Sequence, residues 1–168
     1  MKNIFSLLIV SLIMLSSCIK QDHIIFTNEL VEFDATVLNT PATGKNFPIL
    51  TRVPVYGSPV STSNPSITRT SGTIKFRVNL VGPQFSTDQT IAYSVVTSET
   101  TAVAGTHYTT PGTLVIPANS SFGELVVNVL NPGVSSSTPV ILVLQLEGND
   151  QIKPSENYKR LGISISQL

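Results

Sequence analysis

The residue types that most often do chemistry are scarce in this 168-residue sequence. It contains one cysteine, Cys18, and two histidines, His23 and His107. The sequence has no serine in a G-x-S-x-G elbow, no H-E-x-x-H zinc motif, no C-x-x-C redox motif and no glycine-rich phosphate loop. Composition alone leaves a Ser-His-Asp site open. The missing motifs nevertheless predict a protein that is not an enzyme and that uses no cofactor.

Cys18 lies where a bacterial lipid anchor would be attached. It follows a positive start and a run, residues 4–15, that is apolar apart from two serines; this length suits a signal peptide better than a membrane span. The small residues Ser16 and Ser17 come directly before it, and no second cysteine is present for an internal disulfide. The segment resembles a bacterial lipobox, which implies cleavage before Cys18 and lipidation of it. An ordinary signal peptide with an incidental cysteine is the alternative.

These features predict three parts of the chain: a helical lipoprotein signal peptide at 1–17, a lipidated cysteine with a polar tether at 18–23, and one β-sandwich domain at 24–168. Several acyl chains hold a protein on a membrane far more stably than one chain does. We therefore expect the membrane to be a partner through Cys18. The expected location is the outer membrane, at the cell surface rather than on the periplasmic face.

Charge is sparse and balanced along the sequence. It has 10 Lys and Arg against 10 Asp and Glu; removal of 1–17 takes away Lys2 and no acid, leaving 9 against 10 and a formal charge of −1. The sequence has no basic cluster of the kind that nucleic-acid binding needs, so we expect no nucleic-acid partner. About 150 residues after cleavage suit a single domain with a sizeable core.

Beyond the tether, apolar residues recur at every second position, which is the spacing of β-strands. In the segment 30–37, for example, Val31 and Phe33 are expected to face a core while Glu32 and Asp34 face water. The nearly continuous apolar run 140–146 predicts a central strand that is covered on both faces. The strands expected from this pattern are 24–26, 30–37, 49–53 (a short edge strand), 73–80, 90–96, 113–116, 122–130, 140–146 and 158–166.

No segment after the signal peptide has convincing helical periodicity, and proline and glycine separate the apolar runs. About seven strands of this kind favour an all-β, antiparallel β-sandwich over a barrel.

The middle of the sequence carries a family motif. Residues 101–108 (TAVAGTHY), then 112–117 (GTLVIP), then the strand at 124–129 resemble the Calx-beta motif, which reads roughly T-A-x-x-G-x-D-Y, then G-T-L, then a strand. The match covers about residues 73–165. Together with the lipobox, it is similar to Bacteroidetes-type cell-surface lipoproteins. The resemblance implies an immunoglobulin-like sandwich with an interaction role and without catalysis.

The sequence departs from that motif where calcium would bind. His107 stands in place of the motif aspartate, and the loop 131–138 contains no acid. Calcium takes six to eight oxygen ligands, so we expect no metal site. What remains of the motif is structural. Gly105 suits a turn with positive φ or close backbone approach, His107 is expected to be a hydrogen-bonded turn residue, and Tyr108 is expected to be a buried anchor whose hydroxyl binds backbone.

These features predict a non-catalytic binding or adhesion module that captures a polysaccharide or binds an envelope protein. Tyr56, in a Pro- and Gly-rich segment, is the best candidate for an exposed ligand-binding aromatic residue, although it could instead pack the loop down. The absence of tryptophan from the sequence weakens a glycan platform. The alternative is a structural subunit that docks a partner protein through a sheet edge.

Overall fold

The computed structural model describes residues 28–37 and 40–168. The expected signal peptide (1–17), Cys18, the tether and the strand at 24–26 lie outside the described residues. Within the described part of the chain, no helix is long and apolar enough to span a membrane.

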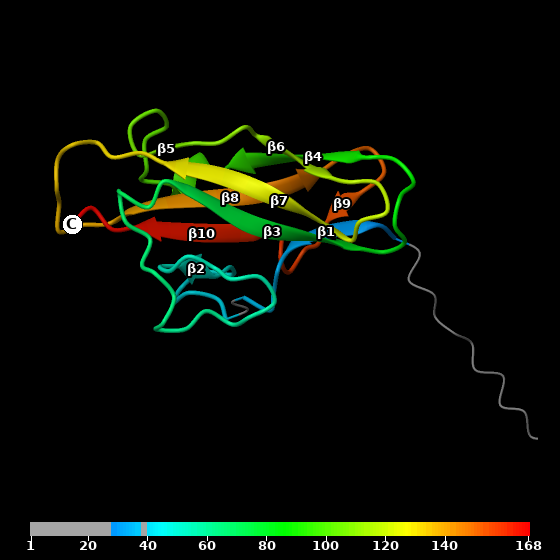
Figure 1. Cartoon of the computed structure of the whole chain (residues 1–168), viewed down its shortest axis with the longest axis horizontal. Coiled ribbons are helices and arrows are strands. Elements are labelled where there is room, and N and C mark those ends of the chain that lie inside the picture. The colour runs from blue at the N-terminus through cyan, green and yellow to red at the C-terminus, as the bar shows by residue number, and fades with distance from the viewer. Residues whose placement is uncertain (1–27, 38–39) are drawn as a thin grey trace, which may run out of the picture.

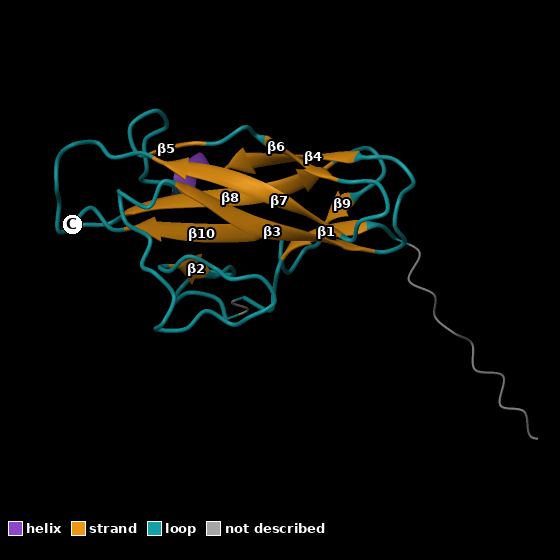
Figure 2. Cartoon of the chain, in the orientation of Figure 1, coloured by secondary structure: helices purple, strands orange, loops and turns teal. Residues whose placement is uncertain are grey.

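The described chain folds into two five-stranded sheets packed face to face (Figures 1 and 2), which confirms the all-β, immunoglobulin-like sandwich. The first sheet has the order β5-β7-β3-β1-β9 and the second has the order β2-β10-β8-β4-β6. The strands are β1 (Leu30–Phe33), β2 (Ile49–Leu50), β3 (Thr73–Val81), β4 (Gln89–Val95), β5 (Tyr108–Thr109), β6 (Thr113–Ile116), β7 (Phe122–Val129), β8 (Val140–Gly148), β9 (Lys153–Pro154) and β10 (Arg160–Ile165).

Seven of these strands contain four or more residues, and three contain only two. The neighbours pair antiparallel except at β1–β9 and β10–β2, which are short parallel pairs that the sequence did not indicate. One turn of 3₁₀ helix, Thr97–Glu99, follows β4.

The core lies between the sheets and is built from the alternate residues that the period-two pattern indicated. In the antiparallel register, Ile74 and Phe76 of β3 lie opposite Val127 and Leu125 of β7, and these four residues are at most 2 % exposed. Strand β8 is the middle strand of the second sheet, in agreement with its nearly continuous apolar run.

The expected strand 30–37 is shorter than predicted, and the expectation that Asp34 faces water was wrong. β1 ends at Phe33, and Asp34 is only 9 % exposed. Its carboxylate oxygen Oδ1 accepts hydrogen bonds from the backbone N–H and the hydroxyl of Thr36, at 3.1 and 2.7 Å. Aspartate side chains commonly stabilise turns by bonding to the backbone two residues later, and this turn ends the strand.

Candidate functional site

The Calx-beta-like turn is a tight structure held by its own backbone. Gly105 has a φ of +78°, a region that favours glycine, and its N–H donates to the carbonyl of Tyr108 at 2.9 Å. The backbone N–H of Val103 donates to Nδ1 of His107 at 2.9 Å, and the N–H of His107 donates to the carbonyl of Val103 at 2.8 Å. His107 is therefore a side chain that closes the turn.

The surroundings of His107 do not assemble a catalytic triad. It lies beside a hollow of about 430 Å³ whose other walls come from residues 132–140, Thr101 and Gln167. This lining contains serine and threonine hydroxyls but no carboxylate. A base without an orienting acid lacks the third group of the nucleophile–base–acid arrangement.

Tyr108 is buried as expected, with 5 % exposure, and burial raises the pKa of its hydroxyl. The predicted hydrogen bond from its hydroxyl to backbone is not found among the described residues. Thr110 makes that connection instead, since its hydroxyl donates to the carbonyl of Val126 at 2.8 Å and also bonds the hydroxyl of Tyr93. The tyrosine whose hydroxyl ties this region together is therefore Tyr93.

Tyr56, by contrast, lies on the surface. Its side chain is 64 % exposed, at a turn in which the N–H of Ser58 donates to the carbonyl of Val55. Its ring stacks on that of Phe122, with centroids 5.7 Å apart and planes 22° from parallel. We call Tyr56 and Phe122 the aromatic pair.

Arg77 supports the aromatic pair from the sheet below. Its guanidinium carbon lies 3.7 Å from the ring centroid of Tyr56 and 4.1 Å from that of Phe122, within the range of cation–π attraction. Nε of Arg77 donates to Oδ1 of Asn79, while Nη1 is buried without a hydrogen-bond partner. The loop that carries Tyr56 is thus held to the first sheet.

The strand register explains how these side chains meet. Successive side chains of a strand point to opposite faces, so Lys75, Arg77 and Asn79 of β3 point outward between the buried core residues. On the neighbouring β7, Phe122 lies opposite Asn79 and Glu124 lies opposite Arg77. One outward-facing patch of the first sheet therefore combines an aromatic, an amide and charged groups.

Two acids lie next to this patch. Glu32 of β1 is opposite Asn79, and Asp34 follows in the turn after β1. Burial raises the pKa of Glu32, the negative charge of Asp34 raises it further, and a hydrogen bond with Ser155 lowers it in part. We call Glu32 and Asp34 the acidic wall.

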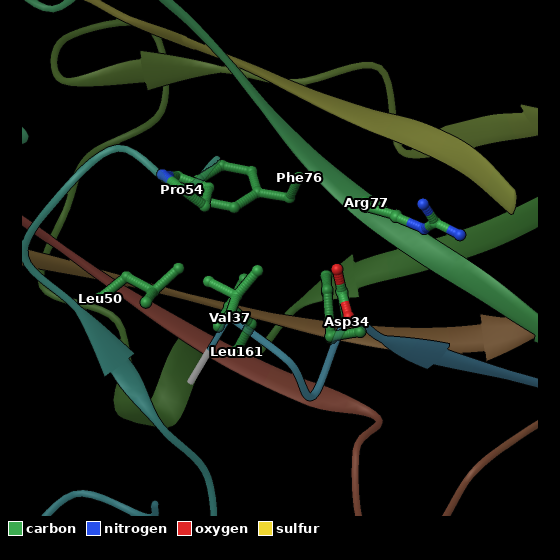
Figure 3. Close-up of a pocket in the computed structure, with 8 residues that line it drawn as sticks. Asp34, Val37, Leu50, Pro54, Phe76, Arg77 and Leu161 are labelled. Carbon is green, nitrogen blue, oxygen red and sulfur yellow. The ribbon is translucent and has the colours of Figure 1, made fainter. Parts of the chain in front are cut away.

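Tyr56 separates two surface hollows. The larger, of about 330 Å³, is here called the groove and is lined by Glu32, Asp34, Thr36, Tyr56, Gly57, Arg77, Asn79, Leu80, Val81 and Ser121. A smaller hollow of about 170 Å³ lies on the other side of Tyr56 and includes Lys75, Phe122 and Glu124. Beneath them is a cavity of about 20 Å³, with Asp34 and Arg77 on one side and Leu50 and Pro54 on the other (Figure 3). That volume suits one water molecule.

Other kinds of site find less support in the described residues. They contain no group of three or more His, Cys, Asp or Glu side chains that could hold a metal ion. The outermost strands of the two sheets are short: β5, β9 and β2 contain two residues each and β6 contains four. Docking of a partner by strand addition usually uses a longer free edge than these.

The sequence indicated Tyr56 but not its partners. The alternating pattern put Arg77 and Phe122 on outward positions of their strands, so an outward-facing phenylalanine was an available signal. That these two strands are neighbours was not. What the sequence could not give is that a loop some twenty residues earlier returns to that face, since loop paths are not encoded in local periodicity.

Comparisons with known proteins agree with this fold. The family described as "Domain of unknown function (DUF4843)" matches residues 63–166. No curated protein sequence matches the chain. Among solved structures, the apo form of the Calx CBD1 domain aligns with a TM-score of 0.51 and 15 % identity, over 83 % of this chain and 98 % of that one. At this identity the likeness shows the fold alone, and it supports the Calx-beta-like sandwich expected from the sequence.

Two further structures align with lower TM-scores and over less of this chain. The calcium binding domain CBD12 of CALX1.1 aligns with a TM-score of 0.49 and 19 % identity, over 60 % of this chain and 40 % of that one. A "putative carbohydrate binding protein" from Bacteroides ovatus ATCC 8483 aligns with a TM-score of 0.42 and 9 % identity, over 58 % of this chain and 32 % of that one.

Proposed function

The chain belongs to the DUF4843 family, and from the surface around Tyr56 we propose that it is a non-catalytic glycan-binding module, held on the outer membrane at the cell surface by lipid on Cys18. The observation that carries the proposal is the exposed aromatic pair beside a groove walled by carboxylates. Sites for small ligands characteristically combine aromatic surface with a few well-placed polar groups.

The aromatic pair supplies the apolar half of such a site. The C–H face of a sugar ring packs well on an aromatic face, and Tyr56 offers a face that is largely open to solvent. Arg77 fixes the orientation of both rings through its contacts with them. A surface that is already ordered loses less conformational entropy when a ligand binds.

The groove supplies the polar half. Glu32, Asp34 and Asn79 offer oxygen acceptors, and the amide of Asn79 also offers donors, which suits a ligand with many hydroxyl groups. The groove is shallow, and its volume of about 330 Å³ is at the small end for ligand pockets. We therefore expect one or two sugar rings to contact it, with affinity in roughly the micromolar to millimolar range.

A lipid anchor complements this role. The described chain begins at one end of the sandwich, and its C-terminus lies at the other end (Figure 1). The groove lies on a face of the first sheet near the end where the described chain begins, because Glu32 and Val81 line it and Leu30 pairs with Val81. A tether of a few residues would hold it close to the membrane surface and leave it open to water and to extracellular polymer. The alternative of a structural subunit docking through a sheet edge is less favoured, because the outermost strands are short.

The test is a glycan array probed with the purified lipoprotein in detergent, followed by titration of the glycans that bind. Tyr56→Ala and Phe122→Ala should weaken binding by at least about tenfold, as loss of an aromatic contact at the centre of a site commonly does. Val134→Ala is the matched control, because Val134 is 74 % exposed and borders the hollow near His107 instead. Equal binding by all three variants, or no binding to any glycan, would contradict the proposal.

A further inference from the structure

The charged groups around the groove differ in the partners that surround them. Lys75 lies 2.7 Å from the carboxylate of Glu124 on the neighbouring strand, so its charge is paired. The guanidinium of Arg77 forms no ion pair among the described residues, but two aromatic rings cover it, its Nε donates to Asn79 and its Nη1 is buried. These are the two cationic side chains among the residues that line the two hollows beside Tyr56.

The two acids of the groove have no cationic partner within the described part of the chain. Neither Glu32 nor Asp34 takes part in an ion pair among the described residues. Asp34 accepts two hydrogen bonds from Thr36 through one oxygen, and Ser155 lies near enough to Glu32 to lower its pKa in part. The two carboxylates are close enough for the charge of Asp34 to act on Glu32, so negative charge is concentrated on one wall.

This asymmetry bears on which glycans can enter. An uncharged sugar brings hydroxyl donors, and hydrogen bonds to a carboxylate are stronger than those to neutral acceptors. A uronic acid or a sulfated sugar brings a further negative charge against the acidic wall, and like charges at this range repel. Like charges facing one another are a common means of excluding wrong partners.

We propose that the groove selects glycans that carry no negative charge, with Glu32 and Asp34 accepting hydrogen bonds from their hydroxyls, and that it excludes uronate-containing and sulfated glycans. The inference rests on the proposed glycan-binding function. It adds a selectivity that an exposed aromatic pair alone would not provide.

The test compares matched polysaccharides that differ only in charge. A neutral glucan, xylan or mannan that binds the lipoprotein is titrated beside its carboxymethylated and sulfated derivatives, at low salt and at high salt. We expect the neutral polymer to bind at least about tenfold more tightly at low salt, and the gap to narrow at high salt, because screening weakens repulsion between partly exposed charges.

Two variants identify the origin of the selectivity. Glu32→Gln and Asp34→Asn keep the shape of each side chain, and asparagine retains an oxygen that can accept the bonds from Thr36. Each should raise the affinity for the anionic derivatives relative to the neutral polymer. Glu29→Gln is the control, since Glu29 is partly exposed and does not line the groove. Melting curves confirm that each variant is folded.

The outcomes separate this inference from the function on which it rests. If an anionic derivative binds as tightly as the neutral polymer, and Tyr56→Ala abolishes both, glycan binding stands and the selectivity is wrong. The same holds if neither acid variant changes the ratio of affinities. If no glycan binds the folded lipoprotein, the proposed function fails and this inference fails with it.

Discussion

The guanidinium carbon of Arg77 lies 3.7 Å from the centre of the Tyr56 ring. This contact joins the middle of β3 to a loop that precedes it by some twenty residues. Tyr56 as a whole residue remains 64 % exposed, so the contact holds it in place without burying it. An aromatic side chain that is both fixed and exposed is suited to binding a ligand.

The energy of this contact can be measured with a double-mutant cycle that combines Tyr56→Ala and Arg77→Met. Methionine keeps much of the length of arginine and removes the charge. We expect a coupling free energy of about 0.5–2 kcal/mol, the range for cation–π pairs from exposed to desolvated. Urea unfolding of the four proteins measures it.

A matched cycle that pairs Arg77→Met with Val134→Ala is the control, since Val134 lies in a different loop and lines a different hollow. That cycle should show no coupling beyond about 0.5 kcal/mol. Additive effects of Tyr56→Ala and Arg77→Met would show that the stacked geometry contributes nothing to stability.

A second prediction concerns Gly123, where the two sheets approach each other closely. A β-carbon at this position would collide with the carbonyl oxygen of Val115 and lie 2.8 Å from a methyl group of Leu114. Both atoms belong to β6, so backbone would have to move. Gly123→Ala should lower the free energy of unfolding by about 1–3 kcal/mol, as expected for overpacking.

Thermal or urea unfolding checks this value, with Thr90→Ala as the control. Thr90 is exposed on β4, and its replacement should change stability by no more than about 0.5 kcal/mol. A Gly123→Ala protein as stable as the parent would show that β6 and β7 are not in close contact.

The fold was largely predictable because its signal is local. Alternate burial along β3, β4 and β7 follows from side chains pointing to opposite faces, and the sequence shows that alternation directly. The end of β1 was missed because Asp34 fits an outward strand position as well as a turn. Its turn-forming bonds to Thr36 become visible only in three dimensions. The parallel pairing of β9 with β1 was missed because a two-residue strand has no period to detect.

The candidate site was predictable only in part. Tyr56 could be singled out as an aromatic residue within a turn-rich segment. The site needs Glu32 from β1, Arg77 from β3 and Phe122 from β7, and their meeting depends on strand order, which local pattern does not determine. The hydrogen bond to backbone that was expected of the Tyr108 hydroxyl is made by the Thr110 hydroxyl, which also bonds Tyr93. The sequence does not show which of these side chains reaches the neighbouring strand.

A third prediction follows from the raised pKa of Glu32. Its ordinary value is 4.5, and burial together with the charge of Asp34 raises the pKa in the folded protein. Between these two values the folded state binds more protons than the unfolded state does. The stabilising contribution of Glu32 is therefore complete below pH 4.5 and is lost as pH rises through the folded pKa.

Glu32→Gln removes this dependence. The free energy of unfolding of the variant minus that of the parent should be larger at pH 7 than at pH 4. Urea unfolding of both proteins at several pH values measures this difference. Glu29→Gln removes one partly exposed carboxylate from the same part of the chain and controls for net charge. A stability difference between Glu32→Gln and the parent that stays constant from pH 4 to pH 7 would contradict the assignment.

The fourth prediction tests the anchor at Cys18. If lipid on its thiol and amine holds the protein on the membrane, Cys18→Ser should move the protein from the membrane fraction to the soluble fraction, because a chain without acyl groups has no comparable membrane affinity. The sandwich should fold unchanged, since the described strands begin at Leu30 and Cys18 is not among them. Cell fractionation, intact mass and circular dichroism measure these three properties.

Gln21→Ser is the control, because it alters the tether and leaves the thiol in place. It should remain in the membrane fraction with the added mass of the acyl groups. A Cys18→Ser protein that still sediments with membranes would mean that another segment provides the attachment. A mature N-terminus at any residue other than Cys18 would instead favour an ordinary signal peptide with an incidental cysteine. In that case the sandwich would act as a free binding protein, and glycan capture by the groove would be separate from attachment to the cell.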